Sequence, residues 1–311
     1  MSLWQSVESK GQEELRILVT GSKGMLGTAL LPVLQHRHQV WGIDIKDCNI
    51  CDAGAISAVL HSWRPELVIH LAAYTNVDGC EKDPQMAEET NSTGTQNVAA
   101  ACADVGAKML YVSTDYVFDG TKTGPYFEND CPNPMSVYGR SKLLGERHVQ
   151  TILSRHFVVR TSWLYGPNGK NFVTTILKVA HQQKVLRVVN DQHGSPTYTR
   201  HLAVKIAELA ETQAFGVYHI TGSGNCSWFE FAETILDLWS VDGVQVIPIS
   251  SDESGRAARR PANSVLENRG LKLAHLGLLP HWKTALAEYL DELKQSGHER
   301  DFKESKHGNA S

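Results

Sequence analysis

The feature that most constrains this chain is a set of three evenly spaced glycines near its N-terminus. Gly21, Gly24 and Gly27 follow an apolar run at 17–19 and precede apolar residues at helical spacing. Glycines allow a tight turn and let backbone N–H groups approach a pyrophosphate, which the positive end of the next helix attracts. The pattern therefore predicts a strand, a turn and a helix that open a dinucleotide-binding unit. Pro32 would kink that helix or cost it a hydrogen bond.

The glycine spacing is Gly-x-x-Gly-x-x-Gly rather than Gly-x-Gly-x-x-Gly, so the glycines alone are equally compatible with an ordinary turn. Asp44 ends the next predicted strand, about 20 residues past the glycines, where a carboxylate can bind the hydroxyls of an adenosine ribose. That position favours NAD, whereas Lys46 could attract the 2′-phosphate of NADP. Asp44 is equally compatible with a simple cap on the strand, and the sequence leaves NADH and NADPH open.

Strands and helices alternate through the first half of the chain. Apolar runs at 67–71, 108–112 and 157–159 predict buried strands, and the segments at 55–63, 93–106 and 143–150 predict helices. This rhythm is typical of a doubly wound parallel sheet. We therefore expect an α/β protein with a Rossmann-like sheet and a smaller C-terminal α/β region that binds substrate.

The same pattern suggests where the domains divide. Residues 15–162 would form the Rossmann domain, with a returning segment at about 197–222. Residues 163–196 and 223–294 would form the substrate-binding region. The polar ends, 1–14 and 295–311, are expected to be flexible tails because they cannot bury a core.

Composition excludes several classes of protein. The 311 residues, of which 41% are apolar, suffice for one large or two modest domains. A net charge of -4 offers no basic field for nucleic acid or an anionic membrane. No apolar run reaches membrane-spanning length, and the N-terminus lacks a signal pattern, so we expect a cytoplasmic protein.

Two cysteines form a single C-x-x-C pair. Cys48 and Cys51 could be a redox pair or half of a metal site, but no second pair and no close histidine pair completes a zinc set. The sequence therefore favours reduced thiols and predicts no metal site.

The candidate catalytic residues lie further along the chain. The fourth predicted strand ends in the polar residues Ser113, Thr114 and Asp115, and Tyr138 and Lys142 follow after a loop. Their spacing of four places both side chains on one helix face. A lysine ammonium would stabilise tyrosinate and lower the pKa of the phenol, which could then donate a proton to a carbonyl oxygen as hydride arrives.

The glycine turn, the Ser-Thr-Asp strand end and the Tyr-x-x-x-Lys pair together resemble the extended short-chain dehydrogenase/reductase superfamily. Within it, the chain resembles the dTDP-4-dehydrorhamnose reductase family in five blocks: 71–78 (L-A-A-Y-T-N-V-D), 113–120 (S-T-D-Y-V-F-D-G), 160–166 (R-T-S-W-L-Y-G), 191–197 (D-Q-H-G-S-P-T) and 260–264 (R-P-A-N-S). The resemblance implies that NADPH or NADH reduces the C4 ketone of dTDP-4-dehydro-L-rhamnose to give dTDP-L-rhamnose, the last step of dTDP-rhamnose biosynthesis.

The resemblance also implies residue roles. Tyr138 would be the proton donor, Thr114 would hydrogen-bond the ketone oxygen, and Lys142 would hold the nicotinamide ribose and tune Tyr138. Cofactor contacts are implied for the pyrophosphate, adenine and flanking positions Gly21, Ser22, Gly24, Met25, Leu26, Asn49, Ile50, Leu71, Ala72, Ala73 and Tyr74. Many relatives carry Asp in place of Asn49. Substrate contacts are implied for Thr75, Thr114, Asp115, Trp163 and Arg260.

Two of these roles have a plain structural alternative. A nucleotide-sugar diphosphate needs cationic donors, and Arg256, Arg259 and Arg260 supply a cluster, although a solvated basic loop would have the same composition. Trp163 is equally compatible with an aromatic platform for a sugar ring and with a core position.

Other functions remain open from the sequence. One is an epimerase or dehydratase acting on another nucleotide sugar, although Tyr116 stands where dehydratases of the superfamily usually place Glu after the Asp. Another is a non-catalytic regulatory subunit, because the β subunit of methionine adenosyltransferase resembles the same reductase family. A dTDP-sugar is the partner that the main interpretation implies, and a homodimer is compatible with the sequence.

Overall fold

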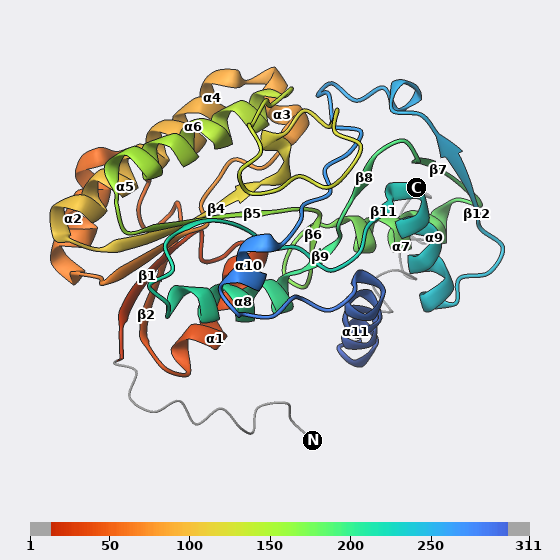
Figure 1. Cartoon of the computed structure of the whole chain (residues 1–311). Helices are drawn as coiled ribbons and strands as arrows, with labels where there is room; N and C mark the ends of the chain where they lie inside the picture. Colours follow the sequence, from red (N-terminus) through yellow and green to blue (C-terminus); the bar gives the residue numbers. More distant parts are fainter. Residues whose placement is uncertain (1–13, 298–311) are drawn as a thin grey trace, which may run out of the picture.

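The computed structural model describes residues 14–297 of the chain. Its centre is a six-stranded sheet in the order β10-β5-β4-β3-β1-β2, and every neighbouring pair is parallel (Figure 1). The strands are β1 (Arg16–Thr20), β2 (Gln39–Ile43), β3 (Leu67–His70), β4 (Lys108–Thr114), β5 (His156–Thr161) and β10 (Gly216–His219). Strand order reverses next to β1, so the sheet is doubly wound and the predicted Rossmann-like fold class is confirmed.

Helices cover both faces of this sheet (Figure 1). One face packs against α1 (Met25–Gln35) and α8 (Thr199–Ala210), and the other packs against α2 (Ala53–Trp63), α5 (Gly94–Val105) and α6 (Val137–Ile152). Within β1, Ile17 and Val19 enter the first core and Leu18 enters the second. Because the sheet is buried on both sides, its strands are continuously apolar, which is why the sequence predicts them well.

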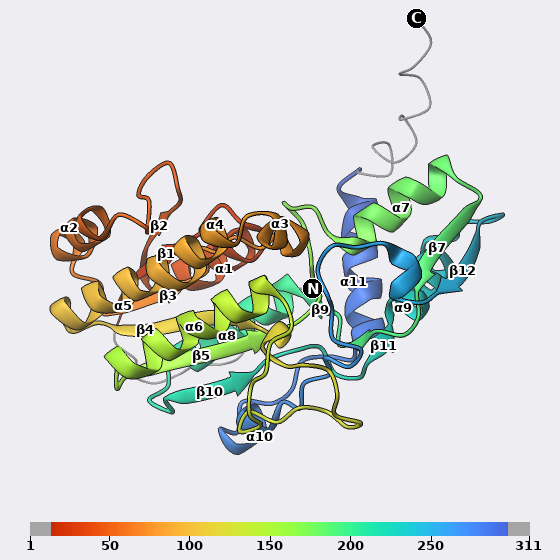
Figure 2. The same ribbon diagram turned by 90° about the horizontal axis from the view of Figure 1, so that it is seen from above.

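A smaller region lies beside the sheet (Figure 2). It has its own core, formed by α7 (Phe172–Gln182), α9 (Trp228–Trp239) and α11 (Trp282–Gln295) with the parallel pair β7 (Val185–Val189) and β12 (Gln245–Ile249). Short pairs connect it further: β6 (Leu164–Tyr165) with β9 (Thr197–Tyr198), and β8 (His193–Gly194) with β11 (Cys226–Ser227). The sequence did not predict β7, whose alternating burial carries a weaker signal than a fully buried strand. The exact domain boundaries stay a prediction.

Several short elements also differ from the sequence-based expectations. The helix expected at 93–106 is α5 preceded by the π-helical turn η1 (Glu89–Thr93), and α3 (Val77–Lys82) and α4 (Pro84–Glu88) precede that turn. The remaining short helices are η2 (Asp115–Val117), η3 (Asp252–Ser254) and α10 (Arg269–Leu273). Pro32 lies inside α1, which continues to Gln35.

The ends of the chain limit what can be compared with the expected tails. Of the tails expected at 1–14 and 295–311, residues 1–13 and 298–311 lie outside the described residues. Between residues 14 and 297, no helix is long and apolar enough to cross a bilayer.

Two histidines are fully buried in this fold. The His70 ring hydrogen-bonds with Thr20 Oγ1 at 2.6 Å and Thr95 Oγ1 at 3.1 Å, so both ring nitrogens are partnered. Burial lowers the pKa of His70 to about 3, and burial together with the neighbouring Arg160 lowers the pKa of His219 to about 3. Both rings are therefore neutral at ordinary pH.

Replacing His70 with Gln should make the free energy of unfolding fall less steeply as the pH is lowered. The unfolded chain binds a proton at His70 below about pH 6.5, whereas the folded protein resists protonation down to about pH 3. Stability is therefore lost as pH falls through this window, by up to about 1.4 kcal/mol per pH unit for this histidine. Urea unfolding at several pH values measures the slope, and exposed His36→Gln is the control. Equal slopes for His70→Gln and the wild-type protein would contradict this assignment.

Candidate active site

A cleft of about 1050 Å³ lies at the carboxyl ends of the sheet strands. This is the edge at which open parallel sheets bind ligands. The segments that follow β1, β3, β4 and β5 line it, together with the start of α6 and Trp228 from the smaller region. Of the residues that the sequence assigns to the site, all but Ser22 and Arg260 line this cleft: Gly21, Gly24, Met25, Leu26, Asp44, Asn49, Ile50, Leu71, Ala72, Ala73, Tyr74, Thr75, Thr114, Asp115, Tyr138, Lys142 and Trp163.

The glycine turn has the geometry of a phosphate cradle. Gly21 has φ +67°, and a Cβ atom there would lie 2.6 Å from the backbone nitrogen of Ala72. A Cβ atom on Gly27 would lie 2.5 Å from the carbonyl oxygen of Gly21. Gly24 caps α1 and provides no side-chain acceptor for the first N–H groups of the helix. An anionic pyrophosphate fits these open donors and the positive helix end.

Asp44 serves as a structural cap and also lines the cleft. One carboxylate oxygen accepts the N–H of Lys23 at 3.0 Å, and the other accepts the N–H of Ile45 at 2.9 Å. A carboxylate offers about four lone-pair sites, so Asp44 can still accept ribose hydroxyls. Lys23 lines the cleft beside it and pairs with Asp47 at 3.1 Å, whereas Lys46 does not line the cleft. Lys23, rather than Lys46, is therefore the cation at this end.

Asn49 and Ile50 lie in the same part of the cleft. Asn49 Oδ1 accepts the N–H of Cys51 at 3.0 Å, and the Ile50 carbonyl accepts from Asn97 Nδ2 at 3.0 Å. These bonds fix the segment after β2, and the buried Ile50 side chain offers an apolar surface to a flat ring. The thiols of Cys48 and Cys51 are both free and also line the cleft.

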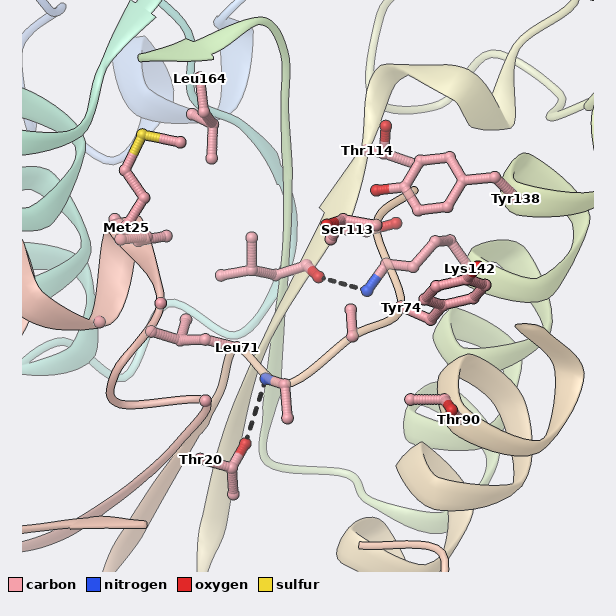
Figure 3. A pocket seen from close by; sticks show the side chains of 18 of the residues that line it. Thr20, Met25, Leu71, Tyr74, Thr90, Ser113, Thr114, Tyr138, Lys142 and Leu164 are labelled. Carbon is pink, nitrogen blue, oxygen red and sulfur yellow. Dashed lines mark hydrogen bonds between the residues drawn. The ribbon is translucent and has the colours of Figure 1, made fainter. Parts of the chain in front are cut away.

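Thr114, Tyr138 and Lys142 lie together on the opposite wall (Figure 3). Thr114 ends β4, and α6 begins at Val137, so Tyr138 and Lys142 occupy its first turns as the spacing predicts. Ser136 caps the helix by accepting the N–H of Gly139 at 3.1 Å. Met25 and Leu164 face this group from the other side of the cleft (Figure 3). The space between them can hold a reacting group.

The predicted tuning of Tyr138 by Lys142 is not observed. Burial raises the pKa of the Tyr138 phenol, and only the hydrogen bond with Thr114 opposes this rise appreciably. Burial also lowers the pKa of Lys142 to about 7, against the influence of Glu146. The Lys142 ammonium donates to the carbonyl of Val112 at 2.8 Å, so it is directed to β4 (Figure 3). Desolvation therefore outweighs the lysine–tyrosine coupling that the sequence suggests.

A buried ion pair lies behind these residues. Arg160 binds Glu146 through two N–H···O bonds of 2.9 and 2.7 Å. The Ser113 hydroxyl donates to the same carboxylate at 2.5 Å. Glu146 lies one helical turn beyond Lys142, so the network ties α6 to the ends of β4 and β5 and fixes Thr114, Tyr138 and Lys142 relative to one another.

Asp115 is a buried acid in the cleft wall. Burial raises the pKa of its carboxyl to about 7. Its Oδ1 accepts from the Thr114 hydroxyl at 3.0 Å, whereas its Oδ2 has no hydrogen-bond partner among the described residues. A buried oxygen without a partner is costly, so this position is suited to a polar ligand.

Trp163 is held flat against a second indole. Its ring stacks on Trp228 with centroids 3.5 Å apart and planes 7° apart, and both side chains line the cleft. Trp163 has φ +49°, and a Cβ atom on Gly194 would lie 2.4 Å from its ring. A glycine is therefore required at 194. The sequence left open whether Trp163 is a core residue or an aromatic platform, and its ring is both packed against Trp228 and presented to the cleft.

Ser22 and Arg260 lie outside the cleft wall. Ser22 is buried, and its N–H donates to the Ile43 carbonyl at 3.1 Å. Arg260 instead forms an ion pair with Asp78 at 2.8 Å. Any contact between these two residues and a ligand stays a prediction.

Comparisons with known proteins identify the family. The RmlD substrate binding domain family matches residues 15–295. The chain is 40% identical to a dTDP-4-dehydrorhamnose reductase of Streptomyces griseus, covering 88% of this chain and 92% of that protein. It is also 40% identical to the spore coat polysaccharide biosynthesis protein SpsK of Bacillus subtilis, covering 89% and 97%. The chain belongs to the dTDP-4-dehydrorhamnose reductase family.

A solved structure supports the same family assignment. The crystal structure of dTDP-4-dehydrorhamnose reductase from Bacillus anthracis in complex with NADP superimposes with a TM-score of 0.88 at 40% identity. The match covers 90% of this chain and all of that chain. Both regions of the fold, including the cleft that lies between them, therefore belong to the architecture of the dTDP-4-dehydrorhamnose reductase family.

Sequence reasoning missed one residue that holds the cleft wall of this reductase-family chain. Asn91 is fully buried in η1, and its Oδ1 accepts the N–H of Tyr74 at 2.7 Å. Its Nδ2 donates to the Tyr74 carbonyl and to Ser141 Oγ, both at 3.0 Å. Asn91 therefore joins the loop after β3 to α6. A buried Asn opening a helix carries no local signal of this role, because both partners are distant in sequence.

Asn91→Ala should destabilise the protein by about 1–3 kcal/mol, because it leaves the partly buried N–H of Tyr74 without its acceptor. The cleft wall should also lose order, so the affinity for NADPH should fall. Urea unfolding and cofactor titration measure the two effects, and Asn225→Ala, at an exposed position, is the matched control. Equal stability of the two variants would refute the role.

Proposed function

We propose that this protein is an NAD(P)H-dependent oxidoreductase that reduces the C4 ketone of dTDP-4-dehydro-L-rhamnose to give dTDP-L-rhamnose, the last step of dTDP-rhamnose biosynthesis. The observation that best supports this proposal is that Thr114, Tyr138 and Lys142 line the same cleft as the glycine turn. Membership of the dTDP-4-dehydrorhamnose reductase family supports this substrate. The names of the relatives favour a reductase over the epimerase and regulatory-subunit alternatives.

The bound nicotinamide cofactor would supply the hydride that adds to C4 of the sugar. The glycine turn and the first N–H groups of α1 would bind its pyrophosphate, and Ile50 would pack on the adenine. The loop at 71–74 would flank it, and Asp44 would accept the ribose hydroxyls. Lys142, oriented by its bond to the Val112 carbonyl, would hold the nicotinamide ribose.

Tyr138 would supply the proton to the ketone oxygen. Its raised pKa keeps the phenol protonated near neutral pH, so the proton is present when the substrate binds. As hydride reaches C4, charge develops on the ketone oxygen, which becomes far more basic than a phenolate, and proton transfer is then favourable. The Thr114 hydroxyl would hydrogen-bond the same oxygen and orient it.

The rest of the cleft would bind the sugar. Asp115, with one unpartnered carboxylate oxygen, would accept from a sugar hydroxyl, and Trp163 would provide an aromatic face. Thr75 lines the same space. We further propose that the reaction takes place in the cytoplasm, where reduced nicotinamide cofactors are regenerated.

The direct test is a cofactor oxidation assay. The purified protein is mixed with NADPH or NADH and enzymatically generated dTDP-4-dehydro-L-rhamnose, and the absorbance of the reduced nicotinamide is followed. We expect substrate-dependent loss of absorbance and a dTDP-6-deoxyhexose product, and the two rates give the cofactor preference. Cofactor binding without oxidation would contradict the proposed reaction.

Tyr138→Phe should lower kcat by a factor of about 100 or more, because the proton donor is removed while the ring remains. NADPH affinity should change little, which fluorescence titration of the cofactor can measure. Tyr218→Phe is the control for removal of a partly buried phenol hydroxyl. The Tyr218 hydroxyl donates to the carbonyl of Ala214, in the segment between α8 and β10. A Tyr138→Phe variant with unchanged turnover would exclude Tyr138 as the donor.

A further inference from the structure

Arg260 forms an ion pair with Asp78, which belongs to helix α3 of the Rossmann region. Asp78 lies in the first turn of α3, and the segment that carries Arg260 follows β12 and passes close to α3 (Figures 1 and 2). Arg260 Nη2 donates to Asp78 Oδ2 at 2.8 Å, and Nη1 donates to Oδ1 at 3.2 Å. The N–H of Ala258 donates to the same Oδ1 at 3.0 Å. The carboxylate therefore holds both the side chain and the backbone of this segment.

The Arg260 guanidinium donates three hydrogen bonds within the protein. Besides its two bonds to Asp78, Nη1 donates to the Ala258 carbonyl at 2.9 Å, and the Tyr116 hydroxyl lies near the guanidinium. An arginine has five N–H donors in a planar fork, and binding a phosphate at two points requires two of them side by side. Asp78 occupies the Nη1–Nη2 edge of the fork, so a phosphate that binds this edge must displace the carboxylate.

The ion pair borders the cleft without lining it. Val77, the neighbour of Asp78, lines the cleft, and so does Tyr116. The Tyr116 ring also packs edge-on against Tyr138 with centroids 5.9 Å apart. Arg260 thus lies one side chain away from the proposed proton donor, at the substrate end of the cleft.

The cleft itself offers little positive charge to a diphosphate. Among the described residues that line it, Lys23 and Lys142 are the cationic side chains. Lys23 pairs with Asp47 at the adenosine end, and Lys142 is buried with its ammonium on the Val112 carbonyl. At the substrate end, Arg260 borders the cleft, and Asp78 neutralises its charge.

We propose that Asp78 competes with the diphosphate of the nucleotide sugar for Arg260. The inference rests on the proposed function, because it requires a nucleoside diphosphate substrate. In the exchange, Arg260 loses two charge-assisted hydrogen bonds to a carboxylate and gains equivalent bonds to phosphate oxygens. Arg260 is therefore paired both before and after the substrate binds.

The burial of the two partners favours this exchange. The Arg260 side chain is 7% exposed and would be costly to leave unpaired, whereas the Asp78 side chain is 37% exposed and can be solvated when the arginine leaves. The hydrogen bond from Arg260 lowers the pKa of Asp78, so the carboxylate is ionised near neutral pH. Asp78 thus reduces the affinity for substrate and product alike and speeds the release of the product.

The test is calorimetric binding of dTDP to the protein saturated with NADP+. Asp78→Asn should tighten dTDP binding by roughly two- to tenfold, as expected for removal of a partly exposed competing charge. Arg260→Gln should weaken it, and Asp78→Asn should bring no gain when Arg260→Gln is also present. Asp104→Asn, which removes the same charge from an exposed site on α5, is the control.

Each outcome decides the inference. Unchanged dTDP binding by Asp78→Asn would overturn the competition. Weaker binding would also overturn it, because Asp78 would then be a residue that positions Arg260. Tighter binding that persists without Arg260 would also overturn it. If the wild-type protein binds NADP+ but not dTDP, the proposed substrate class fails and the competition fails with it. Equal midpoints of thermal unfolding establish that the variants fold. If Asp78→Asn does not fold, Asp78→Ser is used in its place.

Discussion

The cleft depends on a buried ion pair that lies behind its wall. Glu146 and Arg160 are both almost fully buried, and the carboxylate also accepts from Ser113, so each charge is met by several hydrogen bonds. Desolvating two charges is costly, and the loss of one partner would leave the other uncompensated. Because Glu146 belongs to the same helix as Tyr138 and Lys142, this pair sets the distance between that helix and the ends of the two central strands.

The chemistry that this frame supports is governed by desolvation. Burial raises the pKa of Tyr138 and Asp115 and lowers that of Lys142, so the cleft favours the neutral form of each group. A neutral phenol suits a proton donor that acts only when charge develops on a nearby oxygen. Positive charge is meanwhile kept at the rim, where the Asp78–Arg260 pair joins the α3 side of the Rossmann sheet to the C-terminal region. Tyr116, whose ring packs edge-on against Tyr138, lies between that phenol and the ion pair.

Much of this could be read from local patterns. The glycine turn, the strand that precedes it and the shared helix face of Tyr138 and Lys142 are determined by residues within a few positions of one another. The expected lowering of the tyrosine pKa was wrong because spacing gives proximity but not burial, and burial decides the sign. Asn91 and Asp78 were missed because their partners lie elsewhere in the chain.

The sequence by itself determined the fold class and the residue types at the chemical centre. Backbone conformation, helix periodicity and continuous apolar strands are local properties, and they specify a strand–glycine–helix unit wherever the unit occurs. Only the tertiary structure decided which carboxylate pairs with Arg260, and it placed Trp228 flat against Trp163. Long-range pairing depends on how the two regions pack, since an ion pair or a ring stack forms between surfaces rather than between neighbours in the chain.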